Sequence, residues 1–111
     1  MQLLQMRSNR PMSARIPIDR VRIAEFCRKW RIREFALFGS VLRADFRPDS
    51  DVDVLVTFED LAPWTTFDLV QMQNELQPLF GRNVDLVEKR SITNPFRRHA
   101  ILTAKEVVYA A

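Results

Sequence analysis

Residues 38–58 read FGSVLRADFRPDSDVDVLVTF, and this stretch carries the clearest structural signals of the chain. Its last part, residues 52–58, is rich in valine and predicts a buried strand. At its beginning, residues 34–38 are short and apolar and stop at Gly39, which predicts another strand followed by a tight turn. The stretch therefore predicts two strands joined by a compact connection that begins with Gly-Ser.

The connection between these strands carries two local signals. Ser40 is a favourable N-cap, so we expect a short helix over residues 40–43. The sequence Arg-Pro-Asp-Ser at residues 47–50 is typical of a turn. The chain is therefore expected to reverse direction between the two strands.

The rest of the chain alternates between helical and extended patterns. Apolar residues recur with helical spacing on both sides of the central stretch, and Gly81 and Asn94 are favourable helix caps. We expect helices over about residues 18–30, 69–80 and 95–104, and strands over residues 83–87 and 106–109. This order predicts an α+β fold with α/β-like alternation, in which helices pack against a small mixed β-sheet. We expect a single domain over residues 16–111, preceded by a flexible basic tail at residues 1–15.

The composition suits one globular domain: of 111 residues, 47% are hydrophobic and 28% are charged. The chain has one cysteine, Cys27, and one histidine, which argues against a zinc site of the Cys/His kind. Cys27 lies on the apolar stripe of the first helix, so we expect it in the core. No apolar run approaches the roughly 18 residues of a membrane span, and we expect a cytoplasmic protein without a membrane partner.

The net charge of +3 and the pI of about 9.6 are compatible with a polyanionic partner such as nucleotide phosphates or RNA. Taken alone, this charge is interpreted as a solvated basic surface.

Three carboxylates provide the strongest chemical signal. Side chains alternate along a strand, so Asp51 and Asp53 should point to one face and the intervening valines to the core. Adjacent carboxylates repel each other unless a cation lies between them, and oxygen ligands suit Mg²⁺. Asp85 lies in the apolar strand at residues 83–87, where an acid is costly unless it is paired or metal-bound. If the two strands are neighbours, the three acids form a metal site, and one of them can accept a proton.

The Gly-Ser turn predicts a phosphate site beside these acids. Gly39 allows close approach of the backbone, and the Ser40 hydroxyl and nearby N–H groups can bind phosphate oxygens. Arg43, about one turn later, can add a charged contact, and Arg47 is a weaker candidate. Each feature alone is more often structural: Gly-Ser is usually only a turn, and Asp-x-Asp is usually solvated. Their combination, in this order and on these elements, is much more specific.

These motifs resemble the nucleotidyltransferase superfamily related to the palm of DNA polymerase β, and in particular its smallest branch, the minimal nucleotidyltransferases. The resemblance covers roughly residues 20–110, and one departure is Asp45, where many relatives have glycine. It implies a polymerase β palm-like fold and ATP as substrate. It also implies two Mg²⁺ ions at Asp51, Asp53 and Asp85, with Asp85 as the base. The nucleotide phosphates would be held by Gly39 and Ser40.

In this branch the typical partner is a helical HEPN toxin, which the enzyme neutralises by transferring AMP to a tyrosine hydroxyl. The resemblance therefore implies an antitoxin with that partner and allows an oligomer with it. The HEPN signature of Arg, a spacer and His is absent here, and the single His99 is interpreted as a packing or surface residue. Two alternatives stay open. One is a binding antitoxin that occludes its partner. The small size, the basic surface and Trp64, which we expect to be exposed in a loop, allow it. The other is nucleotidyl transfer to RNA, supported only by the basic pI.

Overall fold

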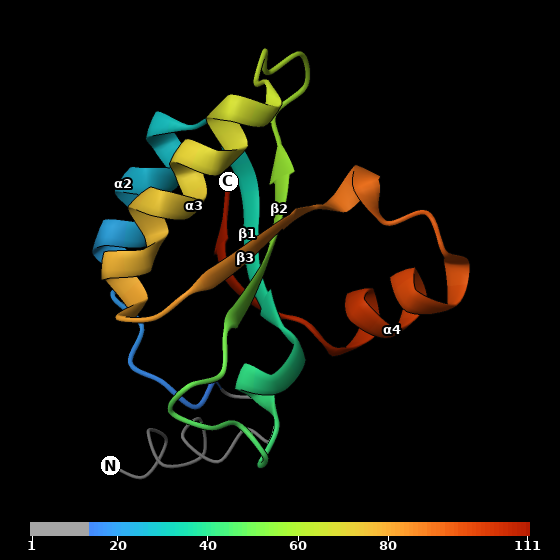
Figure 1. The fold of residues 1–111 in the computed structure, drawn as a ribbon. Coiled ribbons are helices and arrows are strands. Elements are labelled where there is room, and N and C mark those ends of the chain that lie inside the picture. The colour runs from blue at the N-terminus through green and yellow to red at the C-terminus, as the bar shows by residue number, and fades with distance from the viewer. Residues whose placement is uncertain (1–13) are drawn as a thin grey trace, which may run out of the picture.

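A computed structural model describes residues 14–111, which form one four-stranded sheet and its covering helices (Figure 1). The helices are α2 (Arg20–Lys29), α3 (Thr66–Phe80) and α4 (Pro95–Ala104), and the strands are β1 (Ile32–Phe38), β2 (Val52–Phe58), β3 (Val84–Glu88) and β4 (Glu106–Ala110). Short 3-10 turns lie at η1 (Gly39–Leu42) and η2 (Lys89–Ser91). The predicted tail at residues 1–15 lies outside the described residues, except for its last two.

The sheet is mixed, as predicted, with the strand order β3-β2-β1-β4. Strand β1 runs antiparallel to both β2 and β4, whereas β2 and β3 are parallel. Parallel neighbours need a crossover connection, and α3 provides it. This arrangement makes β2 and β3 adjacent, which was the condition for the three acids to lie near one another.

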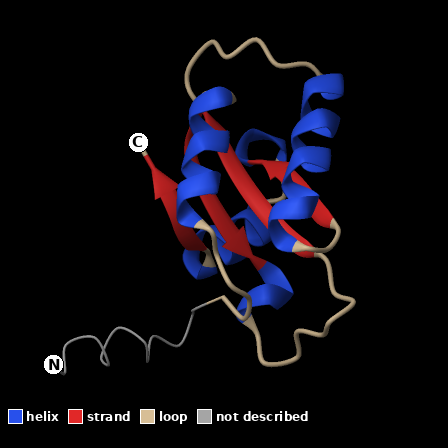
Figure 2. Cartoon of the chain, turned by 90° about the vertical axis from the view of Figure 1, so that its left-hand side faces the viewer, coloured by secondary structure: helices blue, strands red, loops and turns tan. Residues whose placement is uncertain are grey.

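The two faces of the sheet are covered unequally. Helices α2 and α3 lie side by side on one face (Figure 2) and build the main core. Its largest fully buried side chains include Phe35, Leu37, Val54, Met72 and Leu76. The other face has a smaller core, in which Ile92 and Ile101 pack on Ala36, Phe38 and Leu55. Helix α4 therefore covers only part of this second face, on the far side of the sheet from α2 and α3 (Figure 1).

Capping residues fix the ends of the helices. Thr65 and Asp68 form a reciprocal capping box at the start of α3, and Gly81 ends that helix in the left-handed conformation at φ +68°. The Asn94 side chain accepts from two backbone N–H groups at the start of α4, and Pro95 occupies the first turn. The predicted helix ends at Gly81 and Asn94 are thus confirmed.

A polar network ties α2 to α3 at the edge of the main core. The Glu75 carboxylate accepts from Lys29 Nζ at 2.9 Å and from Trp30 Nε1 at 2.9 Å, and Gln71 donates to it from the same helix. Burial raises the pKa of Glu75, but these hydrogen bonds outweigh burial and leave the pKa below its ordinary value. Trp64 joins the network by donating to the carbonyl of Trp30 at 2.7 Å.

Two local predictions need correction. The expected helix over residues 40–43 is a 3-10 turn that begins at Gly39, so Ser40 lies inside it and caps nothing. Gly39 has φ +78°, and this positive φ turns the chain one residue earlier than a Ser cap would. Trp64 is half-buried rather than exposed, because its ring packs against Trp30 at a centroid distance of 5.0 Å. Cys27 is fully buried, as predicted.

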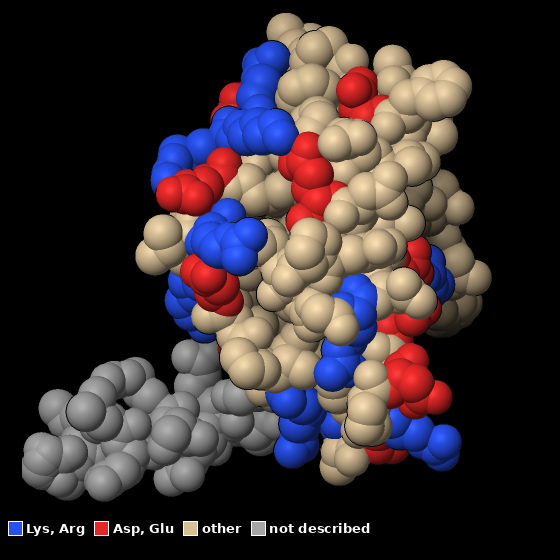
Figure 3. All heavy atoms as spheres, turned by 60° about the vertical axis from the view of Figure 1, so that its left-hand side comes forward, with Lys and Arg blue, Asp and Glu red and all other residues tan. Residues whose placement is uncertain are grey.

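Basic and acidic side chains are interspersed on the face shown in Figure 3, without a continuous basic patch there. No helix within residues 14–111 is long and apolar enough to cross a bilayer.

Candidate active site

The three predicted acids are brought together by the parallel pairing of β2 and β3. In this register Asp53 lies directly beside Asp85, and the preceding pair is Val52 and Val84. Both valines are buried on the main-core side, so the two acids face the opposite side, which α4 covers only in part. Asp53 is half-buried, whereas Asp85 and Asp51, which immediately precedes β2, are exposed. The structure thus places one half-buried carboxylate between two exposed ones.

The electrostatics of Asp53 reflect this crowding. Burial raises the pKa of its carboxyl above the ordinary value, and the charges of Asp85 and Asp51 raise it further. Arg43 and Arg97 act in the opposite direction, and their effect is smaller. Without a cation between the acids, Asp53 therefore holds its negative charge less readily than an isolated aspartate.

The Gly-Ser turn lies directly against Asp53. Phe38, the last residue of β1, pairs with Asp53 across the antiparallel ladder, so Gly39 begins the turn beside this carboxylate. A Cβ atom on Gly39 would lie only 2.3 Å from Asp53 Oδ2, far closer than real Cβ contacts. The turn is held by a hydrogen bond from the Arg43 N–H to the Ser40 carbonyl at 2.9 Å. Glycine is therefore required at residue 39 both by its positive φ and by the closeness of Asp53.

The arginines near the site come from two separate elements. Arg43 follows η1 and pairs with Asp45 at 3.1 Å, and both side chains are largely exposed. Arg97 lies in the first turn of α4 and is near enough to Asp53 to affect its pKa. The sequence analysis missed Arg97, because only the packing of α4 on the sheet places it near the acids. The backbone of Arg47 serves the turn before β2, where its carbonyl accepts from Arg82 at 3.1 Å.

An open pocket adjoins the turn. It has a volume of about 360 Å³ and lies between η1 and α4. Its walls are Phe38, Gly39, Leu42 and Arg43 on one side and Ala100 and Ala104 on the other. We call this pocket the α4 slot.

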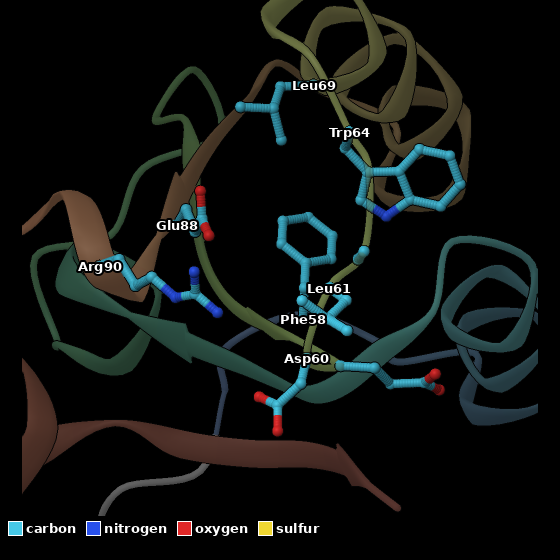
Figure 4. A pocket seen from close by; sticks show the side chains of 9 residues that line it. Phe58, Asp60, Leu61, Trp64, Leu69, Glu88 and Arg90 are labelled. Atoms are coloured by element: carbon cyan, nitrogen blue, oxygen red, sulfur yellow. The ribbon is translucent and has the colours of Figure 1, made fainter.

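A second pocket, of about 340 Å³, lies at the other end of β2. Figure 4 shows Phe58, Trp64, Leu69, Glu88 and Arg90 around it. Phe58 is five residues beyond Asp53 on the same strand, which corresponds to roughly 16 Å. This second pocket is therefore separate from Asp51, Asp53 and Asp85.

Comparison with known proteins places this chain in a family. A model of the nucleotidyltransferase domain matches residues 21–108. Protein adenylyltransferase MntA of Thermococcus cleftensis is 35% identical over 85 residues, which are 77% of this chain and 81% of MntA. A candidate protein adenylyltransferase of Methanocaldococcus jannaschii is 34% identical over 73 residues, covering 66% of this chain and 72% of its own length. The chain belongs to the nucleotidyltransferase family.

Solved structures agree with this assignment. A candidate minimal nucleotidyltransferase superposes with a TM-score of 0.62 at 30% identity, over 95% of this chain and 94% of its own. A toxin–antitoxin complex with AMP-PNP has a TM-score of 0.68 at 20% identity, over 85% of this chain and 75% of its own. A complex of tri-AMPylated Shewanella oneidensis HEPN toxin with MNT antitoxin has a TM-score of 0.61 at 20% identity, over 83% of this chain and 70% of its own. The predicted polymerase β palm-like nucleotidyltransferase fold is thereby confirmed.

Proposed function

We propose that this protein transfers AMP from ATP, with Mg²⁺, to a tyrosine hydroxyl of a helical HEPN toxin and acts as its antitoxin. The observation that carries the proposal is the contact between the Gly39 turn and Asp53, with Asp85 in register beside it. The nucleotide and the acceptor are supported by relatives: one is named a protein adenylyltransferase, and another is bound to a tri-AMPylated HEPN toxin.

Magnesium fits the donors that the site offers. Asp53 and Asp85 supply carboxylate oxygens from paired positions on β2 and β3, and the charges of Asp85 and Asp51 both raise the pKa of Asp53. Within residues 14–111 no three acidic, histidine or cysteine side chains form a complete ligand cluster. Mg²⁺ usually keeps several waters and takes only one or two carboxylates together with substrate phosphates, so a partial protein cage suits it. Bound Mg²⁺ would neutralise charge that develops on the phosphates.

The residues of the chain have distinct roles in this proposal. Backbone N–H groups of the η1 turn and the Ser40 hydroxyl hold the phosphates, and Arg43 adds positive charge. Asp85 takes the proton of the acceptor hydroxyl, whose oxygen forms a bond to the α-phosphorus. The bond from that phosphorus to the bridging oxygen breaks, and pyrophosphate leaves with the electron pair. Arg97 is placed to offset negative charge near Asp53.

The test is a labelling reaction. The purified protein is incubated with radiolabelled ATP, Mg²⁺ and a purified helical HEPN toxin, and the acceptor residue is mapped by mass spectrometry. We expect label on a tyrosine and recovery of cells from the toxin. Asp51→Ala/Asp53→Ala should abolish label, whereas the matched control Asp60→Ala, an exposed acid just beyond the other end of β2, should keep it. If the active wild-type protein leaves the partner unlabelled, the proposal fails.

A second candidate function is neutralisation by occlusion. Two large apolar side chains are almost fully exposed around the start of α3: Leu61 is 92% exposed and Phe67 is 87% exposed. Exposed apolar side chains of this kind suit a protein interface. Under this alternative, Asp51→Ala/Asp53→Ala would still neutralise the toxin at a stoichiometric dose. Under the adenylyltransferase proposal, a substoichiometric dose of wild-type protein suffices and the double variant fails.

A further inference from the structure

The α4 slot is a mainly apolar space beside the phosphate turn. Apart from the Arg43 side chain, its walls are carbon-rich: Phe38 and Leu42 on one side, and Ala100 and Ala104 on the other. Its volume of about 360 Å³ lies in the usual range for small-molecule sites. The slot can therefore take up a flat, apolar-faced group of modest size.

One face of α4 forms the wall of the slot. Ala100, Ile101 and Ala104 recur at helical spacing, and Arg97 lies one turn earlier on the same face. Only Ile101 is buried, where it packs on Phe38 and Leu55 and fixes the distance between α4 and the sheet. The two alanines have no side chain long enough to close the gap that remains. The slot is thus an open space with a fixed width, flanked by Arg97 near the acids.

We propose that the α4 slot holds the nucleobase of the bound nucleotide, packed between Leu42 and the alanine face of α4. This inference rests on the proposed function, because it assumes that Gly39 and Ser40 hold the phosphates. Gly39 and Arg43 line both the phosphate turn and the slot, so the two spaces are continuous. A nucleotide whose phosphates lie on the turn can therefore place its ring in the slot without leaving the protein surface.

The strand order favours the nucleotide over the acceptor as the occupant. Asp85 lies on β3, Asp53 on the central β2, and Gly39 at the end of β1. The acceptor hydroxyl must approach the proposed base, Asp85, and so arrives from the β3 side. The slot adjoins the end of β1, which lies on the side of β2 away from β3. An acceptor tyrosine in the slot would hold its hydroxyl away from Asp85.

The test fills the slot and separates the ring from the phosphates. Ala104→Leu, and Ala100→Leu as a second variant, add bulk to the wall. Thr103→Leu adds the same side chain at a neighbouring exposed position that does not line the slot. Binding of ATP and of inorganic tripolyphosphate, each with Mg²⁺, is measured by calorimetry after circular dichroism has confirmed folding. Tripolyphosphate reports the phosphate turn alone.

We expect Ala104→Leu and Ala100→Leu to weaken ATP binding at least about tenfold, with tripolyphosphate binding within about twofold of wild type. Thr103→Leu should leave the binding of both ATP and tripolyphosphate unchanged. The inference is overturned if both alanine variants bind ATP as wild type does, or if they lose ATP and tripolyphosphate equally. It is also overturned if they keep ATP binding but raise the KM for the protein acceptor, because the slot then takes the acceptor ring. Failure of wild-type protein to bind tripolyphosphate would instead refute the proposed phosphate site.

Discussion

Replacing Gly39 with alanine tests the central contact of the site, because the added methyl group meets Asp53. The new Cβ would lie 2.3 Å from Asp53 Oδ2, and ordinary van der Waals contact begins at 3.4 Å. Backbone atoms of η1 cannot move freely, since the Ser40–Arg43 hydrogen bond and the β1–β2 ladder hold the turn. The Asp53 carboxylate must therefore move away from residue 39 by about 1 Å, which is the difference between these two distances.

Two separate costs follow from this substitution. The left-handed φ of +78° strains any residue with a Cβ by about 1–2 kcal/mol, which lowers Tm by about 4–8 °C for each kcal/mol in a domain of this size. Displacement of a reacting group by 1 Å can reduce the rate about 100-fold. We therefore expect Gly39→Ala to fold with a lowered Tm and to label its acceptor about 100-fold more slowly.

Gly81→Ala is the matched control for the backbone strain. Gly81 has φ +68°, similar to Gly39, but a Cβ there meets nothing within 4 Å. The Gly81→Ala variant should lower Tm by about as much as Gly39→Ala does. It should leave the labelling rate unchanged when both variants are assayed below their Tm. If Gly39→Ala labels within about threefold of Gly81→Ala, the contact with Asp53 does not position the carboxylate and the reasoning is refuted.

Three further predictions concern the metal, the core and a surface network. Mg²⁺ at ten times its Kd should stabilise the wild-type protein by about 1.4 kcal/mol in a thermal melt, and an equal gain in Asp51→Ala/Asp53→Ala would rule out these ligands. Cys27 should react with thiol reagents only on unfolding, because burial raises its pKa to about 12; rapid reaction in native buffer would contradict this. Glu75→Gln should lower the free energy of unfolding by about 0.5–1 kcal/mol at neutral pH, because solvent screens the Lys29–Glu75 ion pair. Because the folded pKa of Glu75 is lowered, this advantage of the wild type is present above the ordinary value of 4.5 and disappears as pH falls through the folded pKa. A difference in denaturant midpoint that does not shrink at all as pH is lowered below 4.5 would argue against the network.

Local signals in the sequence predicted most of the framework. The valine-rich strand β2, the helix end at Gly81 and the cap at Asn94 depend on neighbouring residues alone, and the structure has all three. The alternation that sends Val52 to the core and Asp53 to the other face is equally local. These features could be predicted because each of them needs only a few consecutive residues.

What the sequence could not show depends on long-range packing. Arg97 lies far along the chain from Asp53, and only the contact of Ile101 with the second face of the sheet brings it near. The α4 slot likewise exists because α4 stands beside η1, and no periodicity in residues 95–104 signals a gap there. Ser40 failed as a cap because the positive φ of Gly39 begins the turn early, and a sequence pattern alone does not reveal such a backbone angle.

The geometry of the site is therefore set by the packing of the core. Phe38 pairs with Asp53 only because β1 and β2 hold one antiparallel register, and Leu37 and Val54 pair within the same ladder. A shift of β2 by one residue against β1 would move Val54 out of the main core and turn Asp53 toward it. That exchange exposes apolar side chains and buries a charge, so the register that places Gly39 against Asp53 is also the register that the core stabilises. The acid is held at the turn by residues that have no chemical role, and changes in the main core should therefore alter activity through the position of Asp53.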